Sequence, residues 1–136
     1  MIGQCVSMHR SRILVGALAL CGTALTVNAL PASAAIPSSL VLTAQVSNEP
    51  SHVVLLTCDP AGGNHPDAQA ACGQLSQVDG NLDKLPPVNE HRFCTMIFMP
   101  VKVTARGVWR GRLVRFEDTY ANYCVRDNKT GTLFNF

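Results

Sequence analysis

The sequence predicts an α+β domain with a mainly antiparallel sheet of about five strands, one or two short helices and two disulfides. Short runs rich in aliphatic and β-branched residues alternate with turns of proline, glycine and polar residues. One stretch near the middle of the chain has apolar residues at helical spacing. Four cysteines remain once a leader segment is set aside, and an even number in a small domain indicates disulfide pairs.

The first 34 residues have the features of a secretory signal peptide. Arg10 and Arg12 give a basic start, an apolar run follows, and residues 32–34 (ASA) have the small-x-small form of a cleavage site. No stop-transfer pattern follows this run. We therefore predict that residues 1–34 are a signal peptide that is removed. Residues 35–136 are then one secreted, extracellular domain with no membrane partner.

Removal of the leader changes the charge and the cysteine count. The 11 basic residues lose Arg10 and Arg12 and become nine, against nine acidic residues. A formally neutral domain argues against nucleic acid or another polyanion as a partner. The remaining cysteines lie too far apart for a zinc-binding motif, so neither a metal ion nor a cofactor is predicted. Two disulfides among four cysteines leave three possible pairings: Cys58, Cys72, Cys94 and Cys124.

The first half of the domain predicts two strands and a helix. Residues 40–46 and 52–58 have strand composition, and the turn-forming stretch 47–51 separates them, which indicates an antiparallel pair. Pro66 suits the first position of a helix, and Asp67 suits its positive end. Helical spacing and a terminating glycine follow at Ala71, Cys72, Leu75, Val78 and Gly80.

The second half predicts a pair of long strands. Residues 101–105 alternate as a strand, and a turn is predicted at residues 106–107. Residues 108–120 are expected to form the long partner, with Gly111 as a bulge or twist point. Residues 121–131 are expected to be irregular or briefly helical. Residues 132–136 (TLFNF) are expected to close the sheet as a short final strand.

The sequence does not support an enzyme. It has no GxSxG motif, and the cysteines are better used in disulfides than as nucleophiles. The three histidines after the leader fall in a strand and in two loops: His52, His65 and His91. Glu117 and Asp118 are adjacent, so on a strand they point to opposite faces and cannot act as a catalytic pair.

Residues 93–100 (FCTMIFMP) carry two aromatic residues and two methionines, but no charge. They follow the proline-containing polar stretch 81–92 and end at Pro100, which indicates a surface loop. A buried strand is the alternative interpretation, above all for residues 98–100. Apolar residues displayed on a tethered loop are typical of an interaction site. A protease cleft is a partner that binds extended apolar segments as strands.

Several motifs occur together after the leader. They are SLVLT (39–43), LTCDP (56–60), GNHP followed by ACxxL (63–75), CTM (94–96), PV (100–101), GVWRG (107–111), NxC (122–124) and LFNF (133–136). In this combination they closely resemble the Streptomyces subtilisin inhibitor family of secreted serine protease inhibitors. The resemblance implies the disulfides Cys58–Cys72 and Cys94–Cys124, each expected to stabilise the fold by about 3–4 kcal/mol.

The resemblance also implies where the protease binds. The reactive bond would be Met96–Ile97, with Met96 as P1 and Ile97 as P1′. An unbranched apolar P1 side chain suits the broad hydrophobic S1 pocket of subtilisin. The neighbouring residues expected to contact the protease are Phe93, Cys94, Thr95 and Phe98. A homodimer formed through the sheet, with both loops free, is implied as well.

Two loop positions depart from the family pattern, since Thr95 stands where proline is common and Met99 where aspartate is usual. We predict a standard-mechanism inhibitor of subtilisin-like serine proteases. The alternative is a secreted binding domain, or a substrate for cross-linking enzymes, that has no inhibitory activity.

Overall fold

Residues 36–136 are described by the computed structural model, and the predicted signal peptide lies outside them. Within these residues the chain forms a five-stranded antiparallel sheet in the order β3-β2-β1-β4-β5, two α-helices and two disulfides. This confirms the predicted fold class. The elements are β1 (Ser38–Val46), β2 (His52–Cys58), β3 (Gly62–Gly63), α1 (Ala68–Gln77), the 3-10 helix η1 (Leu82–Lys84), β4 (Val101–Trp109), β5 (Arg112–Tyr120) and α2 (Tyr123–Thr130).

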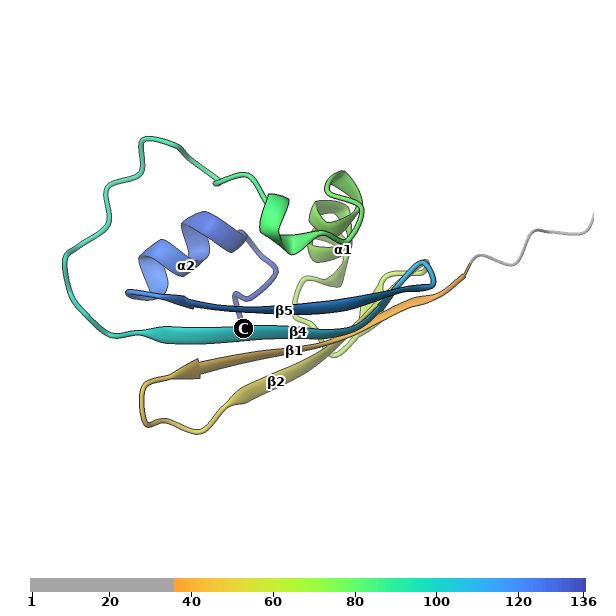
Figure 1. Ribbon diagram of the computed structural model, residues 1–136, viewed down its shortest axis with the longest axis horizontal. Coiled ribbons are helices and arrows are strands. Elements are labelled where there is room, and N and C mark those ends of the chain that lie inside the picture. The colour runs from red at the N-terminus through yellow and green to blue at the C-terminus, as the bar shows by residue number, and fades with distance from the viewer. Residues whose placement is uncertain (1–35) are drawn as a thin grey trace, which may run out of the picture. The chain divides into compact units, whose positions relative to one another are not determined.

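Both helices lie on the same side of the sheet, which gives it a covered face and an open face (Figure 1). Strand β1 is central, and its Leu42 lies opposite Val54 of β2 and Ala105 of β4. Because successive residues of a strand point to opposite faces, every second residue of β1 enters the core. Trp109 and Phe134 are the largest side chains that are fully buried in this core.

Helix α1 lies where the sequence predicts a helix. Asp67 caps it, because its carboxylate accepts a hydrogen bond from the backbone N–H three residues later. Gly80 follows the helix with φ +74°, and a side chain there would overlap the indole ring of Trp109. The Cys58–Cys72 disulfide joins the helix to β2. The covered face is therefore tied to α1 by both packing and a covalent bond.

The turn predicted at residues 106–107 is wrong, because β4 continues to Trp109. Gly107 pairs with Leu40 of β1 and stays in the ladder. The chain reverses instead at Arg110 (φ +44°) and Gly111 (φ +82°). Two successive residues with positive φ match the right-handed twist of a two-residue hairpin, which explains why the reversal falls there and why no bulge is needed in β5.

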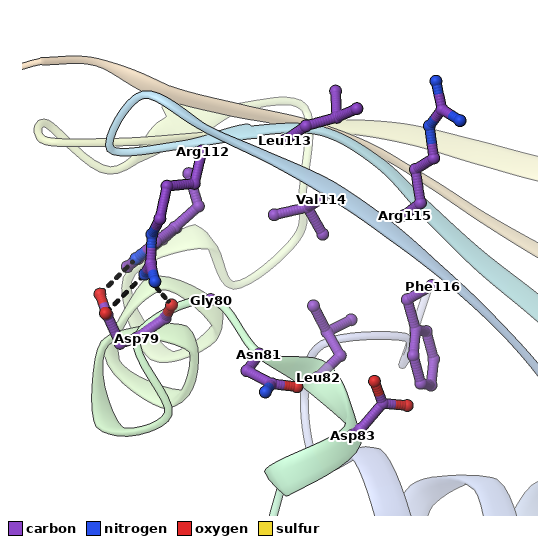
Figure 2. A pocket seen from close by; sticks show the side chains of 11 residues that line it. Asp79, Gly80, Asn81, Leu82, Asp83, Arg112, Leu113, Val114, Arg115 and Phe116 are labelled. Atoms are coloured by element: carbon purple, nitrogen blue, oxygen red, sulfur yellow. Dashed lines mark hydrogen bonds and ion pairs between the residues drawn. The ribbon is translucent and has the colours of Figure 1, made fainter.

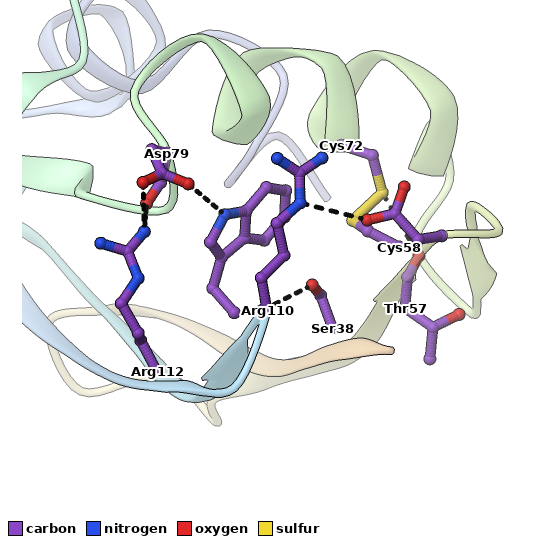
Figure 3. A network of polar contacts seen from close by, with 9 residues as sticks. Ser38, Thr57, Cys58, Cys72, Asp79, Arg110 and Arg112 are labelled. Carbon is purple, nitrogen blue, oxygen red and sulfur yellow. Dashed lines mark hydrogen bonds and ion pairs between the residues drawn. A yellow bond between two sulfur atoms is a disulfide. The ribbon is translucent and has the colours of Figure 1, made fainter. Parts of the chain in front are cut away.

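The β4–β5 turn is held by polar contacts from three other segments (Figure 3). The backbone N–H of Arg110 donates to the hydroxyl oxygen of Ser38 at 3.0 Å, and its side-chain Nε lies 3.5 Å from a carboxylate oxygen of Asp59. Arg112 pairs with Asp79 just after α1. These contacts fix the end of the sheet at which β1 begins.

The final strand predicted for residues 132–136 is also wrong. The fifth strand is the short edge strand β3, and the C-terminal segment folds into turns. Leu133 and Phe134 are adjacent and both fully buried. A strand added to a sheet with one open face would turn one of the two side chains toward solvent. His65 helps to hold this segment, since its Nε2 lies 3.1 Å from the carbonyl oxygen of Leu133.

Candidate functional site

The segment 85–100 leaves η1, curves around α2 and enters β4, and it contains neither helix nor strand (Figure 1). The large apolar side chains of residues 93–99 face solvent. Phe93 is 98% exposed and Met96 97%, while Phe98 is 80% exposed and Met99 45%. The alternative interpretation of residues 98–100 as a buried strand is therefore wrong. We call residues 93–99 the exposed loop.

One buried side chain bridges the backbone carbonyl groups of the two residues on either side of Met96. The side-chain Nδ2 of Asn122 donates to the carbonyl oxygen of Thr95 at 3.0 Å and to that of Ile97 at 2.9 Å. Asn122 is only 7% exposed. Its Oδ1 accepts a hydrogen bond from the N–H of Val125, so the same residue caps α2. The backbone around Met96 is thereby braced while its side chain projects away.

Two further links join the exposed loop to the chain around Asn122. The Cys94–Cys124 disulfide anchors the residue two positions before Met96 to α2. The backbone N–H of Met99 donates to the carbonyl oxygen of Ala121 at 2.9 Å. The loop is thus held before, across and after the Met96–Ile97 bond by three residues close together in the sequence: Ala121, Asn122 and Cys124.

Helix α2 also holds the first limb of the segment. The backbone N–H of Val88 donates to the carbonyl oxygen of Asn128 at 2.8 Å, and the N–H of Asn89 donates to the side-chain oxygen of the same residue at 3.0 Å. The Asn89 side chain then accepts from the N–H of His91. Both limbs of the segment therefore rest on one short helix.

Helix α2 is itself fixed by polar contacts. The Arg126 side chain is 4% exposed, pairs with Asp127 and lies over the ring of Tyr123 at 4.8 Å. At the end of the helix, the backbone N–H and hydroxyl of Thr132 donate to the side-chain oxygen of Gln74 on α1. The Thr132–Gln74 contacts link the chain just after α2 to α1.

A cavity of about 250 Å³ lies elsewhere, between β5 and the segment from Asp79 to Asp83 (Figure 2). None of its lining residues belongs to the exposed loop. The indole N–H of Trp109 donates to Asp79 at 3.2 Å and lowers the pKa of that carboxyl, and Arg112 lowers the same pKa further. Within residues 36–136 no group of three or more His, Cys, Asp or Glu side chains could hold a metal ion.

Comparison with known proteins decides the family. Residues 36–122 match the family model described as subtilisin inhibitor-like. The chain belongs to this family. The subtilisin inhibitor-like family consists of protease inhibitors rather than enzymes, which confirms the prediction that this protein is not an enzyme.

Several relatives match over most of their length. A subtilase-type protease inhibitor of Streptomyces fradiae is 41% identical over 134 residues, which cover 90% of this chain and 94% of the relative. Subtilisin inhibitor-like protein 4 of Streptomyces lavendulae is 43% identical over 115 residues, 80% of this chain and 98% of the relative. Among solved structures, Streptomyces caespitosus sermetstatin in complex with Bacillus licheniformis subtilisin matches with 37% identity and a TM-score of 0.61, over 74% of this chain and 99% of sermetstatin.

All the site residues that the resemblance implies lie on the exposed loop, on either side of Met96. The role of Asn122 does not follow from the sequence, in which it stands only within the NxC motif. The feature of the sequence that could have pointed to Asn122 is its position two residues before Cys124, which forms a disulfide with Cys94 of the loop. A buried amide beside such an anchor is well placed to hold the loop backbone.

Proposed function

We propose that this protein is a secreted standard-mechanism inhibitor of subtilisin-like serine proteases, with Met96–Ile97 as its reactive bond. The observation that carries the proposal is the Asn122 bridge, which braces the carbonyl groups of Thr95 and Ile97 while the Met96 side chain is almost fully exposed. The names of the relatives support it, since they are protease inhibitors and one solved relative is bound to subtilisin.

In this proposal the exposed loop enters the protease cleft as an extended segment. Met96 fills the hydrophobic S1 pocket, because its unbranched thioether chain adapts to an apolar cavity. Phe93 occupies S4 as P4, and Phe98 lies on the primed side as P2′. A loop already held in its bound shape loses little conformational entropy on binding, so it binds more tightly than a flexible peptide of the same sequence.

The same braces explain how cleavage would be resisted. If the protease serine attacks the carbonyl carbon of Met96, the new amine on Ile97 is the leaving group. The Ile97 carbonyl is bound by Asn122, and Met99 is bound to the carbonyl of Ala121, so the leaving amine stays near the acyl group. Religation then competes with hydrolysis, because the effective concentration of the amine is high.

We also propose a homodimer formed through the open face of the sheet. On this face the register pairs Val41 with Leu55 and Val108 with Leu113. Val53 lies two residues before Leu55 on the same face of β2, and all five side chains are exposed. An apolar patch on one face of a sheet favours a self-complementary contact with a second copy. The exposed loop lies at one end of the sheet, so this contact would leave it free (Figure 1).

Secretion is part of the proposal and rests on the predicted signal peptide and on the disulfides Cys58–Cys72 and Cys94–Cys124. Among residues 36–136 no helix is both long enough and apolar enough to cross a membrane. N-terminal sequencing of the protein recovered from culture medium should find a mature chain that starts at or near Ala35.

Titration of subtilisin with the purified mature domain tests the function. We expect protease activity to fall in proportion to the added protein. It should reach zero when about one inhibitor chain is present for each protease molecule, because each chain carries one reactive site. If subtilisin activity does not fall when the domain is added, inhibition is refuted and the binding or cross-linking-substrate alternative is favoured. Calorimetry with a subtilisin variant that lacks its catalytic serine then measures whether the domain still binds without being cut.

A further inference from the structure

The methionines of this chain have an uneven distribution. The sequence has four, of which Met1 and Met8 fall in the predicted signal peptide. The other two, Met96 and Met99, both lie in the exposed loop, three residues apart. A mature domain without its leader would therefore carry thioethers only at the loop that is proposed to bind the protease.

The cysteines and the tryptophan of the domain are protected from a mild oxidant. All four cysteines of residues 36–136 are joined in disulfides. The single tryptophan, Trp109, is 1% exposed. Between the two methionines, Met96 is about twice as exposed as Met99. Because oxidation of methionine follows access of the oxidant to sulfur, a mild oxidant should react with Met96 first.

We propose that the Met96 thioether is an oxidation site through which a peroxide switches the inhibitor off, reversibly, without unfolding it. This inference rests on the proposed function, because it regulates the same P1 side chain. The sulfur lone pair attacks one peroxide oxygen and the O–O bond breaks, which leaves an OH group on sulfur. The released hydroxide takes the proton of that OH group and leaves as water. Sulfur loses two electrons, and the product is methionine sulfoxide. A methionine sulfoxide reductase returns the thioether with two thiols, which become a disulfide while the oxygen leaves as water.

The sulfoxide would weaken binding because the Met96 sulfur is buried in the complex with the protease. In the complex the Met96 side chain is buried in an apolar pocket, and a strongly polar S=O group would lose its water without gaining a partner there. We expect the inhibition constant to rise by about tenfold to a hundredfold. The loop itself should keep its shape, because the braces at Asn122, Cys124 and Ala121 do not use the Met96 side chain.

The test begins with purified mature protein treated with dilute hydrogen peroxide, which catalase removes before subtilisin is added. Mass spectrometry of peptides follows the sulfoxide at each methionine, and the inhibition constant is measured at each time. We expect the sulfoxide to form faster at Met96 than at Met99, and the inhibition constant to rise in step with the Met96 product. Methionine sulfoxide reductases, supplied with dithiothreitol at a concentration that leaves both disulfides of the untreated protein intact, should restore the starting constant.

Two variants separate the methionines, each compared with its own untreated sample. Met99→Leu should show the full rise in the inhibition constant after peroxide, and Met96→Leu should show less than a twofold change. Near-complete oxidation of Met96 with an unchanged constant would overturn the switch. A loss of inhibition by peroxide-treated Met96→Leu as large as that of the unsubstituted protein would overturn it too. Failure of the untreated protein to inhibit subtilisin would instead refute the proposed function and the switch that depends on it.

Discussion

The side-chain nitrogen of Asn122 lies 3.0 Å from the carbonyl oxygen of Thr95, and the same nitrogen lies 2.9 Å from the carbonyl oxygen of Ile97. A single buried amide thus spans the proposed P1 residue, Met96. Because its Oδ1 also caps α2, the loop and the helix share one support. Loss of this amide should therefore affect inhibition and stability in separable ways.

We expect Asn122→Ala to weaken inhibition and to lower stability. Two hydrogen bonds to the loop are lost, each worth about 0.5–1.5 kcal/mol, and loss of the helix cap costs about 1 kcal/mol of unfolding free energy. Asn122→Ser is the matched control, since its hydroxyl can still cap the helix but cannot bridge both carbonyls. Asn122→Ser should keep most of the stability of the unsubstituted protein, but subtilisin should cut it faster than the unsubstituted protein. Equal inhibition constants for all three proteins would show that the bridge has no functional role.

The P1 assignment can be tested by charge. Met96→Lys should shift inhibition toward trypsin, because a trypsin-like pocket contains a buried carboxylate that an apolar P1 leaves unpaired. Met96→Asp should weaken subtilisin binding by several kcal/mol, since it buries an unpaired charge. Met96→Leu should cost less than about 1.5 kcal/mol. Inhibition constants against both proteases decide the matter.

Met99→Asp is the control for that series. Met99 is the proposed P3′ residue, where fewer side-chain atoms contact the protease, so this variant should be much milder than Met96→Asp. The reactive bond would be misplaced if Met99→Asp abolished subtilisin inhibition while Met96→Asp left it intact.

The two disulfides should have different consequences. Peptide mapping of unreduced protein should link Cys58 with Cys72 and Cys94 with Cys124. Replacing either pair by serine should lower the free energy of unfolding by about 3–4 kcal/mol, because each bridge restricts the unfolded chain. Loss of the 94–124 bridge should also speed cleavage of the reactive bond.

Loss of the 58–72 bridge should leave the inhibition constant of the folded fraction unchanged, because that bridge joins α1 to β2 away from the loop. Chemical denaturation measures the stability of each variant, and chromatography of subtilisin digests measures the rate of cleavage. The same cleavage rate in both variants would contradict a bracing role for Cys94–Cys124.

Asp79 should make stability depend on pH. Trp109 and Arg112 lower its pKa in the folded state below the ordinary value of 3.8, so the folded state favours the ionised form. Its contribution is therefore present above pH 3.8 and is lost as the pH falls through the lower folded-state pKa. Asp79→Asn should be less stable than the unsubstituted protein at pH 6, and the difference should shrink in acid. A difference that is constant with pH, measured by denaturant titration, would contradict this account.

The proposed dimer can be broken without touching the loop. Leu55→Asp places a charge beside Val41 and Val53 in the apolar patch on the open face, and burying it against a second copy costs several kcal/mol. Sedimentation should show a monomer at concentrations where the unsubstituted protein is a dimer, with inhibition per chain retained. Thr119→Asp, on the exposed rim of β5, should stay dimeric. A Leu55→Asp protein that remains dimeric would place the interface elsewhere.

The sequence by itself determined the features that depend on local chemistry. Alternation in residues 40–46 predicted a strand, and Asp67 with the helical spacing after it predicted α1. The proline-rich approach to residues 93–100 predicted an exposed loop. In each case, neighbouring residues alone decide which backbone shape satisfies the hydrogen bonds and buries the apolar groups.

Tertiary structure decided between segments that look alike locally. The chain has two identical Arg-Gly dipeptides, and only pairing with β1, which holds Gly107 opposite Leu40, moves the turn to Arg110 and Gly111. The C-terminal residues have strand composition, yet both Leu133 and Phe134 enter the core because the space beneath the sheet admits a turn there.

The Asn122 bridge is also decided by tertiary structure rather than by local sequence. It joins residues about 25 positions apart, and its geometry exists only after the disulfide and α2 have brought them together. No local pattern specifies such a contact, because the amide of an asparagine can serve a cap, a turn or a distant carbonyl equally well. Packing around α2 selects the distant carbonyls of Thr95 and Ile97.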